Sequence, residues 1–143
     1  EQKIKGIGLL PIRTTFFQNK LTRQISSESL WPCQSKINGF EIHNGQTKLD
    51  NTQNLLKIKP IFKDLNLGWY KETKEGGTIA GTYMHGIFEN DNWRDQYINL
   101  IRESKNLPIS NTKSISYKLK RESIIDNLAN EFNKHLNISA VLN

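Results

Sequence analysis

The spacing of apolar residues changes along this chain, from every second residue in the first two thirds to every third or fourth residue in the last third. Residues 39–43 show the first spacing, since Phe40 and Ile42 alternate with Glu41 and His43. A period of two is typical of strands and places residues i and i+2 on one face, whereas a period of 3.6 is typical of amphipathic helices. The sequence therefore predicts an α/β fold, with strands first and helices last.

Five segments in the first two thirds have the β-branched or alternating pattern of strands. The first contains a turn at Pro11, and the last two are expected to form a hairpin around the glycine turn at residues 75–77. Residues 46–63 are polar and contain Pro60, so we expect a variable loop there. The predicted strands are residues 6–17, where the apolar start suggests burial, then 20–25, 39–43, 67–73 and 78–83.

Two helices are predicted in the last third, each with an apolar stripe on one face. Asn90 or Asp91 is available as the N-cap of the first helix. We expect both stripes to be core contacts and not the lining of a cofactor site. The stripes are Trp93, Tyr97, Leu100, Ile101 and Ser104, and then Ile125, Leu128, Ala129, Phe132 and Leu136.

Length and hydropathy favour one soluble, cytoplasmic domain. The 143 residues contain no repeat or low-complexity linker, no apolar run approaches the roughly 20 residues that cross a bilayer, and the mean hydropathy is −0.62. The sequence begins at Glu1, and no signal-peptide pattern follows it. We therefore expect residues 1–143 to be one piece of a longer cytoplasmic protein.

Charge and cysteine content argue against two other classes of site. The net charge is +6, but the basic residues are dispersed and not interleaved with aromatic ones, which favours a solvated surface over nucleic-acid binding. The single cysteine, Cys33, and three histidines lack metal-ligand spacing, so no metal or other cofactor is expected in this segment.

His85 is the main candidate for chemistry. It ends the run TIAGTYMH and precedes Gly86, which allows a sharp turn that leaves the imidazole accessible. An imidazole can take up a proton and return it near neutral pH. A packed or surface histidine is the alternative interpretation.

Three segments, GIGLLPIRTTF, GFEIHNG and GTYMHGIFEN, occur in this order and are followed by the tail KLKRESIIDNLANEFNKHLNI. Together they resemble the C-terminal glutamine amidotransferase domain of the cobyric acid synthase family, over residues 6–138. The resemblance implies that the chain is the C-terminal part of a flavodoxin-like class I glutamine amidotransferase domain. In such a domain a cysteine and a histidine hydrolyse the side-chain amide of glutamine.

The resemblance assigns the catalytic histidine to His85. The family's nucleophile lies on a glycine-flanked turn upstream of the first segment, and no such turn is present here. Cys33 follows a proline in LWPCQSK without a glycine, so we interpret it as a partly buried connecting residue. The chain alone is therefore expected to be inactive.

Three further residues are weaker candidates. The resemblance suggests that Glu41 and His43 border the glutamine pocket, although two unrelated polar residues at an exposed sheet edge would show the same pattern. Glu89 could orient His85, or it could be a solvated charge at a helix start. His135 is expected to be a surface residue.

For the whole enzyme the resemblance implies ATP-dependent amidation of corrinoid carboxylates, from adenosylcobyrinic acid a,c-diamide to adenosylcobyric acid in cobalamin biosynthesis. Glutamine would supply the ammonia. The corrinoid, ATP and Mg²⁺ would bind a separate synthetase domain that this segment lacks. Two alternatives stay open: a related amidating ligase, such as an a,c-diamide synthase or a cell-wall type, and a catalytically silent domain that binds a partner.

Overall fold

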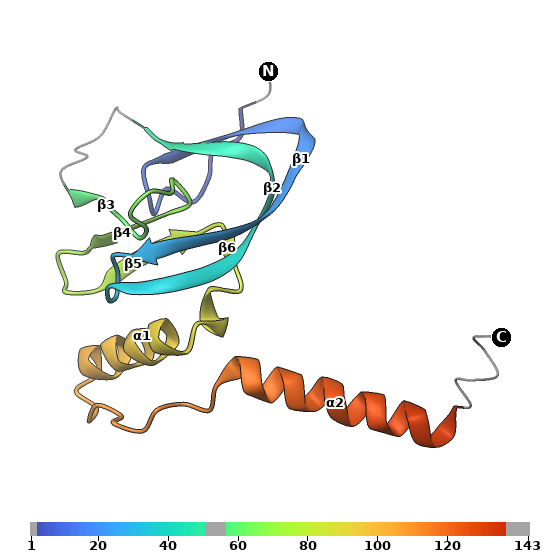
Figure 1. Cartoon of the computed structure of the whole chain (residues 1–143). Helices are drawn as coiled ribbons and strands as arrows, with labels where there is room; N and C mark the ends of the chain where they lie inside the picture. The colour runs from blue at the N-terminus through green and yellow to red at the C-terminus, as the bar shows by residue number, and fades with distance from the viewer. Residues whose placement is uncertain (1–2, 51–56, 137–143) are drawn as a thin grey trace. The chain divides into compact units, whose positions relative to one another are not determined.

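The computed structural model of the chain describes residues 3–50 and 57–136, which belong to two units. The strands of these ranges all lie in the first unit, Glu1–Ser110, together with one α-helix. The second unit, Asn111–Asn143, contains the other α-helix (Figure 1). The described residues form both strands and helices, with the strands first, as the sequence predicts.

A long hairpin forms the main part of the first unit (Figure 1). Strand β1, Ile12–Ser29, pairs antiparallel with strand β2, Ser35–Leu49. The short strand β6, Met84–His85, joins the other edge of β2, so the sheet order is β1-β2-β6. The predicted strands at residues 20–25 and 39–43 are confirmed, and each is part of a longer strand.

A second antiparallel sheet has the order β3-β4-β5. Its strands are Lys59–Pro60, Gly68–Glu72 and Thr78–Thr82. The predicted hairpin around residues 75–77 is confirmed, because β4 and β5 pair directly and Gly76 has a φ of +79° between them. A positive φ favours glycine, which has no Cβ to clash with the backbone.

The chain passes from one sheet to the other at Tyr83, whose N–H donates to the carbonyl of Leu67 at 2.7 Å. The predicted strand 78–83 therefore ends one residue early. After β6 the chain turns at Gly86, forms the 3₁₀ helix η2, Ile87–Glu89, and enters helix α1, Asp91–Ser104.

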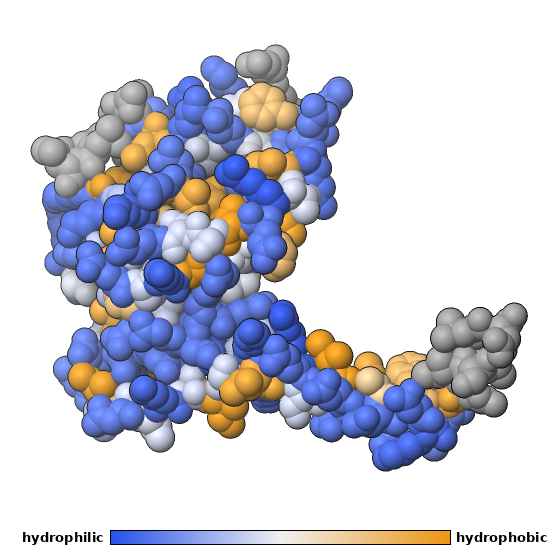
Figure 2. Space-filling view, in the orientation of Figure 1, coloured by the Kyte–Doolittle hydropathy of each residue, from blue (hydrophilic) through white to orange (hydrophobic). Residues whose placement is uncertain are grey.

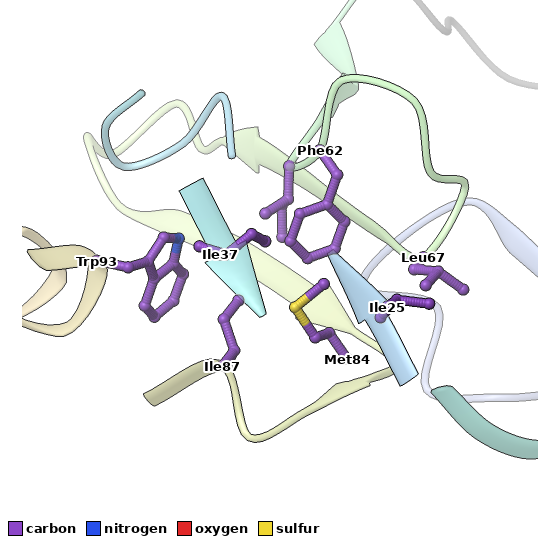
Figure 3. Packing of buried hydrophobic residues seen from close by; sticks show 8 residues of the cluster. Ile25, Ile37, Phe62, Leu67, Met84, Ile87 and Trp93 are labelled. Carbon is purple, nitrogen blue, oxygen red and sulfur yellow. The ribbon is translucent and has the colours of Figure 1, made fainter. Parts of the chain in front are cut away.

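The core lies between the two sheets and the start of α1 (Figure 3). The Trp93 side chain reaches into it from α1, and its Nε1 donates to the carbonyl of Trp31 at 2.9 Å. Burying one large apolar side chain contributes roughly 1.5–3 kcal/mol, so this cluster is the main stabilising element of the unit. The buried cluster is Ile25, Ile37, Ile61, Phe62, Leu67, Met84, Ile87 and Trp93.

The predicted loop at residues 46–63 is wrong at both ends. Its first residues continue β2, and Ile61 and Phe62 are each 1% exposed in the core. They are drawn inward because the backbone there pairs with the end of β1, where the N–H of Leu30 donates to the carbonyl of Ile61 at 2.7 Å. Residues 51–56 of this loop lie outside the described ranges.

The buried strand predicted at the start of residues 6–17 is also wrong. Strand β1 begins only at Ile12, and Ile7 is 91% exposed. The described residues before Leu10 are exposed and belong to no strand, and the run meets the sheets only at its end, where Leu10 lies beside Gly81 of β5 and the carbonyl of Pro11 accepts a hydrogen bond from the N–H of Asp50. The turn at Pro11 is confirmed, since the N–H of Ile12 donates to the carbonyl of Leu10.

Both predicted helices are present, but only the first has its stripe in a core. In α1, Trp93 is buried and Tyr97 packs against the cluster, while Ile101 is 44% exposed. In α2, Tyr117–His135, the predicted stripe is exposed (Figure 2), and its expected core contacts are wrong for this unit. The described part of the second unit is a single helix, which offers no second element to cover the stripe.

The flavodoxin-like sheet implied by the resemblance is parallel, whereas every strand pair in the described ranges is antiparallel. Antiparallel neighbours need only a short turn, and parallel neighbours need a longer crossover. The described residues therefore show a mixed helix and strand structure, and the flavodoxin-like parallel sheet stays a prediction.

Candidate active site

His85 lies at the end of β6, immediately before the turn at Gly86, whose φ is +77°. The neighbouring Met84 is 4% exposed, whereas His85 is exposed, as alternation along a strand requires. Within residues 3–50 and 57–136, no hydrogen bond or ion pair joins the imidazole to another side chain. The ring is therefore accessible and able to exchange a proton with a reacting group.

Glu41 and His43 lie on one face of β2, as their spacing predicts. Nε2 of His43 is 2.8 Å from Oε1 of Glu41, and Nε of Arg23 on β1 donates to Oε2 at 2.5 Å. The Glu41 side chain is only 5% exposed, so a carboxylate removed from water has a polar partner at each oxygen, the guanidinium of Arg23 at one and the imidazole of His43 at the other. The exposed-edge alternative is therefore excluded for Glu41.

The alternation of side chains along β2 is confirmed, but the polar residue Glu41 faces inward and the apolar residue Phe40 faces outward, the reverse of a simple amphipathic strand. The polar Glu41 points inward, and the apolar Phe40 is 44% exposed. Arg23, which sequence reasoning missed, directly faces Glu41 in the hairpin register. Only knowledge of that register would have revealed the pair, because eighteen residues separate them in the sequence.

Tyr83, two residues before His85, joins the hairpin through its hydroxyl group. The oxygen lies 2.8 Å from Oγ1 of Thr47 and 3.1 Å from Oγ1 of Thr14, and the two threonine oxygens are 2.7 Å apart. The ring centroid of Tyr83 is 5.4 Å from that of His43. The segment that carries His85 is thus attached to both long strands.

The structure does not bring all the predicted site residues together. In the β2–β6 register, His85 faces Phe40 and Met84 faces Glu41. Paired residues of antiparallel strands point to the same side of the sheet. His85 therefore lies on the outer face with Phe40, while Glu41 and His43 lie on the inner face.

Glu89 lies in η2, and its side chain is directed at the turn after His85. A Cβ built on Gly86 would be 3.4 Å from Oε1 of Glu89. This places the carboxylate beside the main chain of the turn. No hydrogen bond joins this carboxylate to the His85 ring in the described residues, and an orienting role of Glu89 in the complete active site stays a prediction.

Cys33 lies in the connection between β1 and β2 and is partly buried, as predicted. Its Sγ is 3.8 Å from Oγ of Ser35, and Nδ2 of Asn92 lies 3.8 Å from the sulfur. Neither neighbour is a base that could generate a thiolate. His135, 77% exposed in its side chain, is a surface residue as predicted.

The described residues lack two other kinds of feature. They contain no group of three His, Cys, Asp or Glu side chains that could hold a metal ion. Neither described α-helix combines the length and the apolar content needed to cross a membrane. One open groove of about 330 Å³ runs beside Arg13 and Lys48, and no predicted site residue lines it.

Comparison with known proteins agrees with the motifs. The model of the CobB/CobQ-like glutamine amidotransferase domain matches residues 1–93. Cobyric acid synthase of Prochlorococcus marinus strain AS9601 is 83% identical over 143 residues, which is 100% of this chain and 28% of that protein. Cobyric acid synthase of Synechococcus sp. strain CC9311 is 41% identical over 142 residues, covering 96% of the chain and 28% of that protein.

The chain thus spans about 28% of the length of the curated relatives that it matches. The resemblance drawn from the three ordered motifs is confirmed by these matches. The matched residues 1–93 of this chain include the exposed His85 and the buried Glu41 with its partner His43. The chain belongs to the CobB/CobQ-like glutamine amidotransferase domain family.

Proposed function

We propose that this chain is part of the glutaminase domain of a cobyric acid synthase. In this proposal glutamine supplies ammonia for ATP-dependent amidation of corrinoid side-chain carboxylates, which converts adenosylcobyrinic acid a,c-diamide to adenosylcobyric acid. The single observation that carries the proposal is an exposed histidine on a glycine turn at a strand end, in a chain of this family.

His85 is proposed to move two protons. A cysteine thiolate, paired with protonated His85, attacks the amide carbon of glutamine. The imidazolium then protonates the departing nitrogen as the carbon–nitrogen bond breaks, which releases ammonia and leaves a thioester. Water attacks the thioester while the imidazole takes its proton, so glutamate leaves and the thiolate–imidazolium pair is restored.

The nucleophile in this scheme is a cysteine outside these 143 residues. Cys33 is the single cysteine of the chain, and its described neighbours are Ser35 and Asn92. It lies in the β1–β2 connection, whereas His85 is on β6. His85 would thus be half of a catalytic pair that a second segment completes.

Glu41, His43 and Glu89 enter the proposal as supporting residues. Both oxygens of Glu41 already have partners, so Glu41 itself has little capacity to bind a polar ligand. His43 and Arg23 have more, and the Arg23 side chain is 55% exposed. We propose that Glu41 and His43 border the glutamine pocket and that Glu89 helps to orient His85. Glu41 and His43 lie on the face of the sheet opposite His85. Their role at the glutamine pocket is therefore tested through the KM for glutamine.

The rest of the reaction is assigned to parts of a longer protein. ATP, Mg²⁺ and the corrinoid would bind a synthetase domain, as the similarity to cobyric acid synthase implies. A cytoplasmic location is part of the proposal, because ATP is available there. We also propose that the complete amidotransferase domain is flavodoxin-like and includes these two antiparallel sheets.

The test uses a chimera in which this chain replaces the matching 143 residues of the 83% identical cobyric acid synthase. His85→Ala should lower glutamine-dependent amidation by about 10²–10⁴-fold, the usual contribution of general acid–base catalysis, and spare amidation from added ammonia. Product analysis separates cobyric acid synthesis from other amidations. Full glutamine-dependent activity in His85→Ala would overturn the proposal.

The isolated chain provides the control. It should release no ammonia from glutamine, and Cys33→Ser in the chimera should leave both activities unchanged. Turnover by the isolated chain that disappears in Cys33→Ser would contradict the assignment of the nucleophile.

A further inference from the structure

The orientation of the His85 ring needs an explanation, because no side chain in the described residues binds it. In many enzymes a carboxylate orients the catalytic imidazole through a hydrogen bond. Because Glu89, the proposed orienting carboxylate, makes no hydrogen bond to the ring in the described residues, the direction of the ring depends there on the main chain of β6 and of the turn at Gly86.

Only a short ladder of backbone pairing between β6 and β2 holds that main chain. Strand β6 contains two residues, and only two residue pairs join it to β2. Met84 is buried in the core on one side of the strand (Figure 3). A Cβ built on Gly39 would lie 2.5 Å from the carbonyl oxygen of His85, so the two backbones are in close contact there.

The side chain of Asn90 holds the turn from the other end. Its Oδ1 accepts a hydrogen bond from the N–H of Asn38 at 2.8 Å, and its Nδ2 donates to the carbonyl of Asn38 at 2.9 Å. The same nitrogen lies 3.3 Å from the carbonyl oxygen of Gly86 and 2.9 Å from that of Ile87. One amide group therefore connects β2 with the turn that follows His85.

This pairing replaces the next step of the strand ladder. Continuing the register beyond Phe40 and His85 would place Ile87 opposite Asn38, but the positive φ of Gly86 turns the chain away first. A primary amide offers one acceptor and two donor hydrogens, so it can bind an N–H and a C=O as a peptide group does. The Asn90 side chain thus makes the hydrogen bonds to Asn38 that a continued β6 would have made.

Helix capping does not account for these bonds. Asn90 occupies the N-cap position of α1, as the sequence predicts, but its side chain makes no capping hydrogen bond. Its oxygen is directed to β2 instead of to the N–H groups of the first helical turn.

We propose that Asn90 is a positioning residue for His85, whose amide side chain extends the β2–β6 ladder and fixes the main chain that directs the imidazole. The inference rests on the proposed function, since it requires His85 to transfer protons. Displacing a catalytic group by about 1 Å can lower a rate by as much as 10²-fold. Asn90 would act on catalysis without touching the substrate.

Asn90→Asp in the chimera is the first test. The aspartate keeps the shape and an acceptor for Asn38, and it is an equally good N-cap, but it loses the Nδ2 donor. We expect the glutamine-dependent kcat to fall about 10- to 100-fold, with KM for glutamine and ammonia-dependent amidation within about twofold of wild type. Asn90→Ser, which also places a favoured N-cap residue there and removes the whole amide, should show at least the same loss.

Asn99→Asp is the matched control. Asn99 on α1 makes the same reciprocal pair with the backbone of Ser110, with Nδ2 to carbonyl and N–H to Oδ1 distances of 3.1 and 2.9 Å, far along the helix from His85. It should leave the glutamine-dependent kcat unchanged.

Three outcomes would overturn the inference: unchanged kcat in both Asn90 variants, parallel loss of ammonia-dependent amidation, or an equal effect of Asn99→Asp. His85→Ala identifies which idea has failed. If His85→Ala abolishes glutamine-dependent activity while the Asn90 variants retain it, the positioning role is wrong and the proposed function stands. If His85→Ala is active, the proposed function itself is wrong.

Discussion

The two α-helices have similar sequence patterns but different surroundings. Helix α1 begins beside the sheet and inserts Trp93, 3% exposed, into the core of the first unit. Helix α2 is longer, with 19 residues against 14, yet its Leu128 and Phe132 are 57% and 51% exposed. An apolar stripe thus correctly predicts a helix in both cases, but the burial that it predicts is found only in α1.

The difference matters for stability because a helix in water gains little from propensity alone. In the described part of the second unit, α2 has side-chain pairs along its own surface, such as Lys134 with Glu131 at 2.7 Å. Exposed pairs of this kind contribute at most about 1 kcal/mol. In α1, burial of Trp93 and its aromatic neighbours supplies considerably more.

The largest expected effect is that of Trp93→Ala. Truncation of a fully buried aromatic side chain should lower the free energy of unfolding of the first unit by about 3–5 kcal/mol, since it leaves a cavity in the core. Urea unfolding of the 143-residue chain, followed by far-UV circular dichroism, measures the change. Phe88→Ala, at a 51% exposed ring that contacts Trp93, is the control and should cost about 1 kcal/mol. Equal losses would contradict the assignment of the core.

An intermediate effect is expected for Glu41→Gln, which removes the charge of a buried group with two partners. The free energy of unfolding should fall by about 1–3 kcal/mol, and in the chimera KM for glutamine should rise about three- to tenfold if the pair borders the pocket. Glu28→Gln breaks an exposed 3.4 Å pair with Lys63 and should change stability by less than about 1 kcal/mol. A stability loss with unchanged KM would restrict Glu41 to holding the hairpin.

The smallest effect is expected for Phe132→Ala in α2. Because the ring is half exposed, the free energy of unfolding of the isolated chain should change by no more than about 0.5 kcal/mol. The same urea titration measures it. A loss above about 2 kcal/mol would show that another part of the chain covers the stripe and would remove the contrast between the two helices.

Local sequence patterns were sufficient to predict most helices, strands and turns, but not to predict which of them pair or pack with one another. The hairpin around Gly76 follows from turn chemistry, which acts over a few residues, and the sequence also places the start of α1 next to Asn90, although the Asn90 side chain binds β2 and not the first helical turn. Ile61 and Phe62 were assigned to a loop because their burial depends on pairing with the end of β1, about thirty residues earlier. Short-range patterns contain no information about such a pairing.

The candidate site shows the same division. The motif and its glycine identified His85, and period two placed Glu41 and His43 on one face. The motif did not reveal that Arg23 completes that cluster or that Asn90 joins β2 to the turn after His85. It also did not show that the β2–β6 register separates His85 from Glu41.

By itself the sequence determined the α/β order, the family and the histidine with the chemistry to transfer a proton, because these depend on residue type and local spacing. The tertiary structure decided which face of β2 turns inward, which helix is buried and which residues hold the His85 turn. These properties arise from strand register and packing between distant segments, where a shift of one residue moves every side chain to the opposite face.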